Sequence, residues 1–235
     1  MQLTTSQIDQ LFTFTRQHYV EWYDLQSELV DHLANSIEAQ WEQFPKRTFE
    51  EALNIEFKKF GIYGFMDVVY KRRAVLNKKY YKIVWGYFKD FFSIPKIVLS
   101  IGMVLALFIV LKLSVYREYI FFGTYLLLFI DMFYELYKNQ KTTKKRKQSG
   151  EKLWLFEEVI NNYGYCSGVL AAPFNMMAYR FNHPDSMLNN DYGIMALSLF
   201  LVSFSLFLFI IFKIIPSKAE SYLLDTYPEY KLEKL

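Results

Sequence analysis

The chain has 235 residues, of which 53% are hydrophobic, 20% aromatic and 22% charged, with a formal net charge of +3. Such high apolar content beside so many charges predicts two environments within one polypeptide. The only cysteine, Cys166, excludes an internal disulfide and a cysteine-based zinc cluster built by one chain. Residues 1–70 carry 5 basic and 11 acidic residues, net −6, whereas the remaining residues carry 22 and 13, net +9.

The first third of the chain has the pattern of a small helical domain. Apolar residues recur at helical spacing from Thr5 to His18 and again from Trp22 to Gln43. Thr48 and Glu51 have the spacing of a capping box, which predicts the start of a third helix. That helix is expected to end at Gly61, because glycine readily adopts the left-handed conformation that closes helices.

A fourth, longer helix is predicted to start near Gly64 and to carry a basic run toward the membrane. Between residues 80 and 92 its aromatic side chains alternate with lysines, as in helices that lie at a headgroup interface. A nucleic-acid surface is the alternative. Because proximity to a membrane span already accounts for both residue types, we expect contact with the lipid bilayer and no direct binding of nucleic acid.

Four segments are long and apolar enough to cross a hydrocarbon layer of about 30 Å. The third is the least hydrophobic and is expected to pack between the others, with a re-entrant or interfacial segment as the alternative. The sequence therefore predicts an all-α fold, in which a small cytosolic helical domain precedes a four-helix transmembrane bundle. The four predicted spans are Ile97–Leu111, Tyr119–Tyr137, Ile160–Tyr179 and Tyr192–Phe212.

The predicted division of the chain follows from these elements. It comprises a helical domain at residues 1–70, a juxtamembrane helix at 71–95, a four-span domain at 96–215 and an amphipathic tail at 216–235. The end of the tail is expected to pack either on the helical domain or on the membrane interface.

Basic residues predict the orientation of the spans, since cytoplasmic loops carry an excess of lysine and arginine. Six basic residues lie between Lys71 and Lys82, and seven lie between Lys138 and Lys152. The first twenty residues lack the features of a secretory signal. We therefore expect a multi-pass protein of the inner (cytoplasmic) membrane with both termini in the cytosol.

Acidic residues line the face of the second helix opposite its apolar stripe. A metal site or a proton relay could be built from Glu28, Asp31 and His32. These residues span too much of the helix circumference, however, for their side chains to converge. We expect this face to bind a basic partner or the protein's own basic loop. The predicted partner-binding residues are Asp24, Glu28, Asp31, His32 and Glu38. No catalytic residue, metal site or cofactor is predicted.

The segment WYDLQSELVDHLANSIEAQW, followed by FEEALNIEFKKFG, resembles the HAAS-type helical signalling domains. The likeness covers about residues 7–71. In that family such a domain typically precedes several membrane spans, and it is associated with transcription regulators of the PadR kind. The resemblance thus implies a cytosolic protein partner, with a transcription regulator as one candidate. It supplies no catalytic residues. Ile62–Phe65 stand where the family's pattern has a proline.

A second group of acids is expected near the inner leaflet. Asp131 and Glu135 share one face of the second span, and the third span enters from the same side. Because acids inside a membrane are costly, they usually face partners or water. One hypothesis is therefore a cation site formed by Asp131, Glu135, Glu157, Glu158, Asn161 and Asn162. The alternative is that the neighbouring basic loop simply neutralises these acids.

The preferred functional hypothesis is a non-enzymatic membrane protein whose helical head serves as an interaction or signalling module. The alternative is a small transporter or channel component that uses the carboxylate cluster. A membrane hydrolase is less favoured, because the sequence has no G-x-S-x-G, H-E-x-x-H or phosphate-binding glycine loop. A homo-oligomer through surplus apolar surface on the head is a further possibility.

Overall fold

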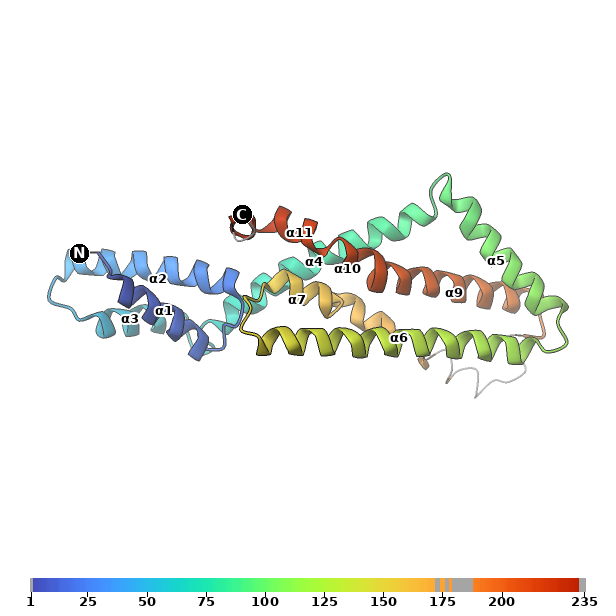
Figure 1. The fold of residues 1–235 in the computed structure, drawn as a ribbon, viewed down its shortest axis with the longest axis horizontal. Helices are drawn as coiled ribbons and strands as arrows, with labels where there is room; N and C mark the ends of the chain where they lie inside the picture. The colour runs from blue at the N-terminus through green and yellow to red at the C-terminus, as the bar shows by residue number, and fades with distance from the viewer. Residues whose placement is uncertain (1, 172–173, 176–177, 179–187, 233–235) are drawn as a thin grey trace. The chain divides into compact units, whose positions relative to one another are not determined.

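The fold comes from a computed structural model that describes residues 2–171, 174–175, 178 and 188–232. These residues form helices and no strand, which confirms the all-α prediction for this part of the chain (Figure 1). The elements are α1 Thr5–Gln17, α2 Tyr23–Gln43, α3 Phe49–Lys58, α4 Met66–Phe91, α5 Lys96–Leu113, α6 Arg117–Gln148, α7 Leu155–Asn161, the 3-10 helix η1 Gly164–Ala171, α9 Asp191–Phe209, the π-helix η2 Ile210–Ile214, α10 Ile215–Ser217, α11 Ala219–Thr226 and α12 Pro228–Leu232.

The contacts divide the chain into two compact units. The first, here called the head unit, contains residues 1–77, 150–159 and 223–235. The second, here called the membrane unit, contains residues 78–149 and 160–222. The head unit is therefore assembled from three separate stretches of sequence, one of which precedes the membrane-length helices and two of which follow α6 and α9.

Local signals account for the helices at the start of the head unit. Thr48 and Glu51 form the predicted capping box at the start of α3, and Gly61 has the predicted left-handed backbone, with φ of 76°. Gly64 also has a positive φ, and a Cβ there would lie 3.0 Å from the Phe57 ring. The predicted boundaries of the first three helices lie within three residues of the observed ones.

The core of the head unit lies between α2 and its neighbours α1 and α3 (Figure 1). The apolar stripe of α2 faces this core, so its acidic residues are left on the opposite face. Aromatic rings from α1, α3 and the turn before α4 close the core at one end. The buried stripe of α2 comprises Leu25, Leu29, Val30, Leu33, Ile37 and Trp41.

The membrane unit contains three helices that are long and apolar enough to cross a membrane. They are Lys96–Leu113, Arg117–Arg146 and Asp191–Ser217, found among the residues that the structure describes. Their inner faces pack together, whereas many large apolar side chains on α5 and α6 point outward, as expected for contact with lipid. The packed residues include Leu111, Phe121, Tyr125, Ile194, Leu197 and Leu201.

The predicted span Ile160–Tyr179 is not confirmed as a helix. Its described part consists of the end of α7, a break at Tyr163, the 3-10 helix η1 and the helical residues 174, 175 and 178. Tyr163 and Gly164 have φ values of 60° and 49°, which interrupt the right-handed helix. Residues 172–173, 176–177 and 179 of this span lie outside the described residues. Among the described residues there are three membrane-length helices, and the predicted four-helix bundle stays unconfirmed.

The structure also corrects the predicted loop between Lys138 and Lys152. Helix α6 continues through most of this basic stretch and ends at Gln148. The stretch is rich in lysine, arginine and glutamine, which favour helix. The first glycine after the apolar segment is Gly150, whose φ of 72° is the left-handed conformation that follows helix ends. The basic residues therefore extend a membrane-length helix and do not form a loop.

Candidate functional site on the acidic face of helix α2

The five predicted partner-binding residues all lie on α2, and their surroundings differ. Glu28, Asp31 and His32 are exposed, whereas Asp24 and Glu38 are partly buried. Glu38 accepts a hydrogen bond of 2.8 Å from the backbone N–H of Leu3. His32 meets the Phe60 ring edge-on, with 5.9 Å between ring centroids. His32 therefore packs against an aromatic side chain at the border of the acidic face.

The segment at residues 150–159 is held against the first turns of α2 by reciprocal hydrogen bonds. The N–H of Tyr23 donates to the carbonyl of Leu153 at 2.8 Å, and the N–H of Leu155 donates to Oδ1 of Asp24 at 3.1 Å. Since the first N–H groups of a helix have no partner within it, each bond satisfies the start of one helix. Asp24 thus caps α7, and Leu153 caps α2, which has no side-chain cap of its own.

Charged side chains extend this contact. Glu158 accepts a hydrogen bond of 2.5 Å from the indole of Trp22 and forms an ion pair of 3.0 Å with Arg73. The Arg73 guanidinium also lies 5.0 Å from the Trp22 ring centroid, a cation–π distance. Lys152 lies 4.0 Å from the centroid of the Tyr23 ring. A cation from the chain's own basic segment therefore contacts the Tyr23 ring at the start of α2, and binding of a basic group to the acidic face stays a prediction.

The C-terminal stretch of the head unit completes the contact through aromatic residues. The Tyr227 hydroxyl accepts a hydrogen bond of 3.1 Å from the N–H of Phe156. The rings of Tyr227 and Tyr230 lie 4.8 Å and 5.3 Å from the Trp154 ring, which is only 2% exposed. The predicted packing of this tail on the helical domain, one of two alternatives, is therefore observed.

These three stretches of chain enclose a pocket of about 300 Å³. Four acidic side chains and one arginine line it, so its charge favours a cationic group. Aromatic rings form part of its wall. The lining residues are Tyr23, Asp24, Ser27, Glu28, Asp31, Arg72, Trp154, Thr226, Tyr227, Pro228 and Glu229.

Two buried polar atoms in this pocket have no hydrogen-bond partner among the described residues. They are Oδ2 of Asp24 and Nε of Arg72. Burial raises the pKa of Asp24, and the hydrogen bond from Leu155 and the neighbouring Tyr227 hydroxyl and Arg72 charge offset part of the increase. Because unpaired buried polar atoms are costly, the pocket is suited to a group that donates to Asp24 and accepts from Arg72.

The predicted inner-leaflet acids are divided between the two units. Glu157 and Glu158 belong to α7 in the head unit, where Glu158 has the partners described above. Asp131, Glu135, Asn161 and Asn162 belong to the membrane unit. In the described parts of the chain, no group of three or more His, Cys, Asp or Glu side chains could hold a metal ion.

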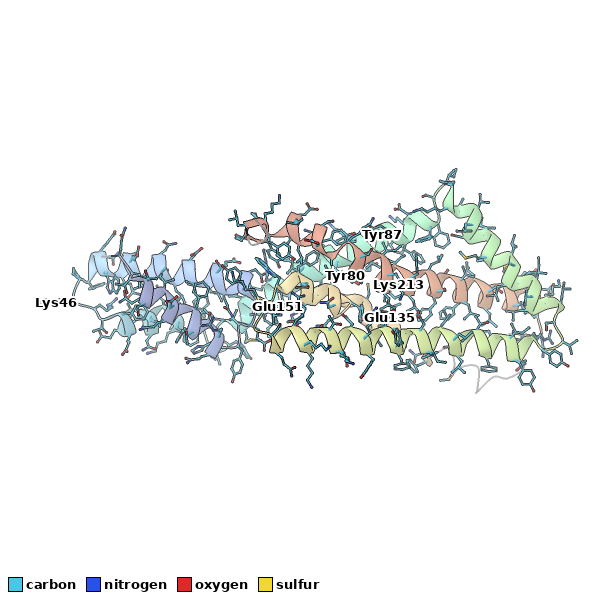
Figure 2. All side chains as sticks on the ribbon, viewed as in Figure 1. Lys46, Tyr80, Tyr87, Glu135, Glu151 and Lys213 are labelled. Carbon is cyan, nitrogen blue, oxygen red and sulfur yellow. The ribbon has the colours of Figure 1, made fainter. Side chains whose placement is uncertain are left out.

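Within the membrane unit, Glu135 pairs with a cation. Its side chain is 7% exposed and forms an ion pair with Lys213 of η2, and Figure 2 shows the two residues facing each other. Lys138 Nζ lies 4.0 Å from the other carboxylate oxygen of Glu135. Asp131 is exposed on α6, Asn162 is exposed after α7, and the carbonyl of Asn161 accepts a hydrogen bond from Asn139.

Sequence reasoning missed Lys213, Arg73, Trp154 and Tyr227. Lys213 carried a usable signal, because it is a single charge beside a long apolar run, and such a charge usually has a partner. Trp154 and Tyr227 carried none, since their neighbours in space are far away in sequence.

No protein-family model matches the chain, and no curated protein or solved structure shows a significant similarity to it. The resemblance to HAAS-type domains therefore stays a prediction from the motif.

Proposed function

We propose that this protein is a non-enzymatic signalling adaptor of the inner membrane, whose head unit binds a basic segment of a cytosolic protein on the acidic face of α2. Partner binding is coupled to the membrane helices. The resemblance noted in the sequence makes a transcription regulator the first class of partner to test.

One observation carries this proposal. The pocket on α2 has one wall from the segment that follows α6, and another from the segment that follows α9 and α11. Both walls are thus covalently connected to membrane-length helices, and we propose that a movement of either helix reaches the pocket through this connection. A lipid-dependent or ligand-dependent movement within the membrane would change the affinity of the head for its partner.

The assembly of the head unit from three separate stretches of chain also supports the proposed topology. Residues 1–77, 150–159 and 223–235 pack as one unit, so they share one side of the membrane. If Asp191–Ser217 crosses the bilayer once, the chain must cross once more between residues 160 and 190. This requirement favours the predicted span Ile160–Tyr179, part of which lies outside the described residues. The basic residues at 71–82 and 138–152 support a cytosolic location for this side.

The chemistry of the pocket specifies the partner's side of the contact. Glu28 and Asp31 are exposed at its rim and attract a lysine or arginine from solution. Oδ2 of Asp24 accepts a hydrogen bond from that cation, and Nε of Arg72 donates to a backbone carbonyl of the same segment. Both unpaired atoms of the free protein thus gain partners on binding.

Site-specific cross-linking in cells tests the proposal on the full chain. A photoreactive residue replaces Ser27 in the pocket wall or, as a control, Ala39, which is exposed on the same helix outside the pocket. We expect one discrete protein adduct from position 27, and only background from position 39.

Charge reversal provides the matched control. Glu28→Lys/Asp31→Lys is expected to reduce the adduct at position 27 at least tenfold, whereas Asp9→Lys/Glu42→Lys, with the same change in charge outside the pocket, leaves it intact. An adduct equally strong in both variants, or no adduct from a folded protein, would exclude this face as the binding site.

A further inference from the structure

The C-terminal half of α4, residues 78–91, has an exposed aromatic stripe. Tyr81 and Trp85 are 51% and 45% exposed, and Phe92 just beyond the helix is 36% exposed. Phe88 lies between them, with its ring 5.7 Å from Trp85 and 5.2 Å from Phe92. These aromatic side chains form one continuous row along the helix. A soluble surface rarely leaves such a row in water.

Three exposed lysines form a second row beside the aromatic one. At 100° per residue, Lys78, Lys82 and Lys89 fall within about 40° of one another around the helix axis. The row adjoins the aromatic stripe, since Lys89 Nζ lies 5.5 Å from the centroid of the Trp85 ring. The exposed surface of α4 is therefore divided lengthwise into an aromatic half and a cationic half.

The opposite face of this part of α4 is fixed within the membrane unit. Tyr80 and Val84 are buried, and the hydroxyl of Tyr87 lies 2.9 Å from both the Tyr222 hydroxyl and Lys218 Nζ. Figure 2 shows Tyr80 and Tyr87 on this segment. Since the helix cannot rotate without losing these contacts, the direction of the aromatic and lysine rows is defined.

The end of α4 is also joined to a membrane-length helix. Figure 1 shows a sharp bend between α4 and α5, and the Ser100 hydroxyl of α5 donates a hydrogen bond of 2.7 Å to the carbonyl of Phe91. Helix α5 begins at Lys96, only a few residues after the aromatic row ends. The aromatic row therefore ends four positions before the start of a membrane-length helix.

From these observations we infer that residues 78–92 lie in the headgroup layer and bind anionic phospholipids. Tyr81, Trp85, Phe88 and Phe92 enter the boundary between headgroups and acyl chains, and Lys78, Lys82 and Lys89 contact the phosphates. Aromatic side chains prefer this boundary, and anionic headgroups attract lysines beside it. This inference does not depend on what the head unit binds.

Trp85 provides a direct probe of this contact. The other three tryptophans, Trp22, Trp41 and Trp154, are buried in the head unit. The full-length protein is placed in nanodiscs with equal amounts of phosphatidylglycerol and phosphatidylcholine, and one of the two lipids is brominated near the top of its acyl chain. The difference between the wild type and Trp85→Phe gives the quenching of Trp85 by each lipid.

We expect brominated phosphatidylglycerol to quench Trp85 at least twofold more than brominated phosphatidylcholine, and high salt to reduce the difference. The triple variant Lys78→Gln/Lys82→Gln/Lys89→Gln should remove the preference while quenching continues. Lys141→Gln/Lys144→Gln/Lys145→Gln, which removes three exposed lysines of α6, should retain it. Absence of Trp85 quenching by either lipid, or equal quenching by both in the wild type, would overturn the inference.

Discussion

Asp24 and Leu155 are 131 positions apart in sequence, yet the carboxylate of one caps the helix that begins at the other, with an N–O distance of 3.1 Å. Together with the bond from Tyr23 to Leu153, this contact holds the segment after α6 on the helix that bears the acidic face. The pocket on the acidic face of α2 is therefore built by distant parts of the chain.

Loss of this cap should destabilise the head unit. Asp24→Ala removes the acceptor for the Leu155 N–H and is expected to lower the free energy of unfolding by about 0.5–2 kcal/mol, the usual cost of losing a helix cap. Asp24→Asn keeps an oxygen at the same position and should lose much less. Chemical denaturation of the full-length protein, followed by circular dichroism, measures both. Equal losses in the two variants would contradict the capping role.

The same residue should make stability depend on pH. Because burial raises the folded-state pKa of Asp24 above its ordinary value of 3.8, the folded protein binds a proton at this carboxyl before the unfolded chain does. The contribution of Asp24 to stability therefore increases as the pH falls through the raised value toward the ordinary one. We therefore expect the stability of Asp24→Asn, measured relative to the wild type, to be higher at neutral pH than in acid. A constant difference from about pH 7 to pH 4 would argue against a raised pKa.

The Tyr227 hydroxyl should matter more than an average tyrosine hydroxyl. Tyr227→Phe retains the ring that packs on Trp154 but leaves the buried N–H of Phe156 without its acceptor. We expect a loss of about 1–3 kcal/mol, the desolvation cost of an unpaired buried donor. Tyr63→Phe, at an exposed position of the same unit, is the control and should be neutral within about 0.5 kcal/mol. A neutral Tyr227→Phe would show that another group satisfies Phe156.

The ion pair between Glu135 and Lys213 should couple α6 to the π-helix η2. Either Glu135→Gln or Lys213→Gln leaves one charge without its partner at the edge of the apolar layer, so the double variant should be more stable than the sum of the single losses implies. A coupling energy of about 0.5–3 kcal/mol is expected from thermal unfolding in nanodiscs.

The exposed pair of Asp67 and Lys71 serves as a comparison for this cycle. Its coupling should stay below about 1 kcal/mol, because water screens both charges. If the Glu135 and Lys213 cycle gives no larger value than this surface pair, the two membrane helices are not joined by their charges.

Because the head unit is assembled from three stretches of chain, we predict that the chain crosses the membrane an even number of times between one stretch and the next. In a Cys166→Ser background, single cysteines at the exposed positions Ser6, Glu151 and Asp225 should react with a membrane-impermeant maleimide only from the cytosolic side. A cysteine at Val115, between α5 and α6, should react only from the opposite side. Labelling of positions 151 and 225 from different sides would contradict the additional crossing between residues 160 and 190.

The helices at the start of the head unit could be predicted because their signals are local. The ends of α3 are set by residues close in sequence, namely Thr48, Glu51 and Gly61. The apolar stripe of α2 can be predicted from residue spacing alone. The prediction of a basic loop after the second span is wrong. Lysine and arginine are good helix formers, so α6 continues through most of this stretch. The partner of Glu135 and the caps exchanged by Asp24 and Leu153 could not be predicted, because such pairings depend on tertiary packing.

The pocket wall formed by Thr226, Tyr227 and Glu229 is synthesised only after all three membrane-length helices. During translation the acidic face of α2 is made first and stays open until that last wall arrives. A chain that stalls or is cut before residue 226 presents the acids of α2 without the aromatic wall that shapes the pocket. The complete pocket therefore exists only in a chain whose three described membrane-length helices have all been synthesised.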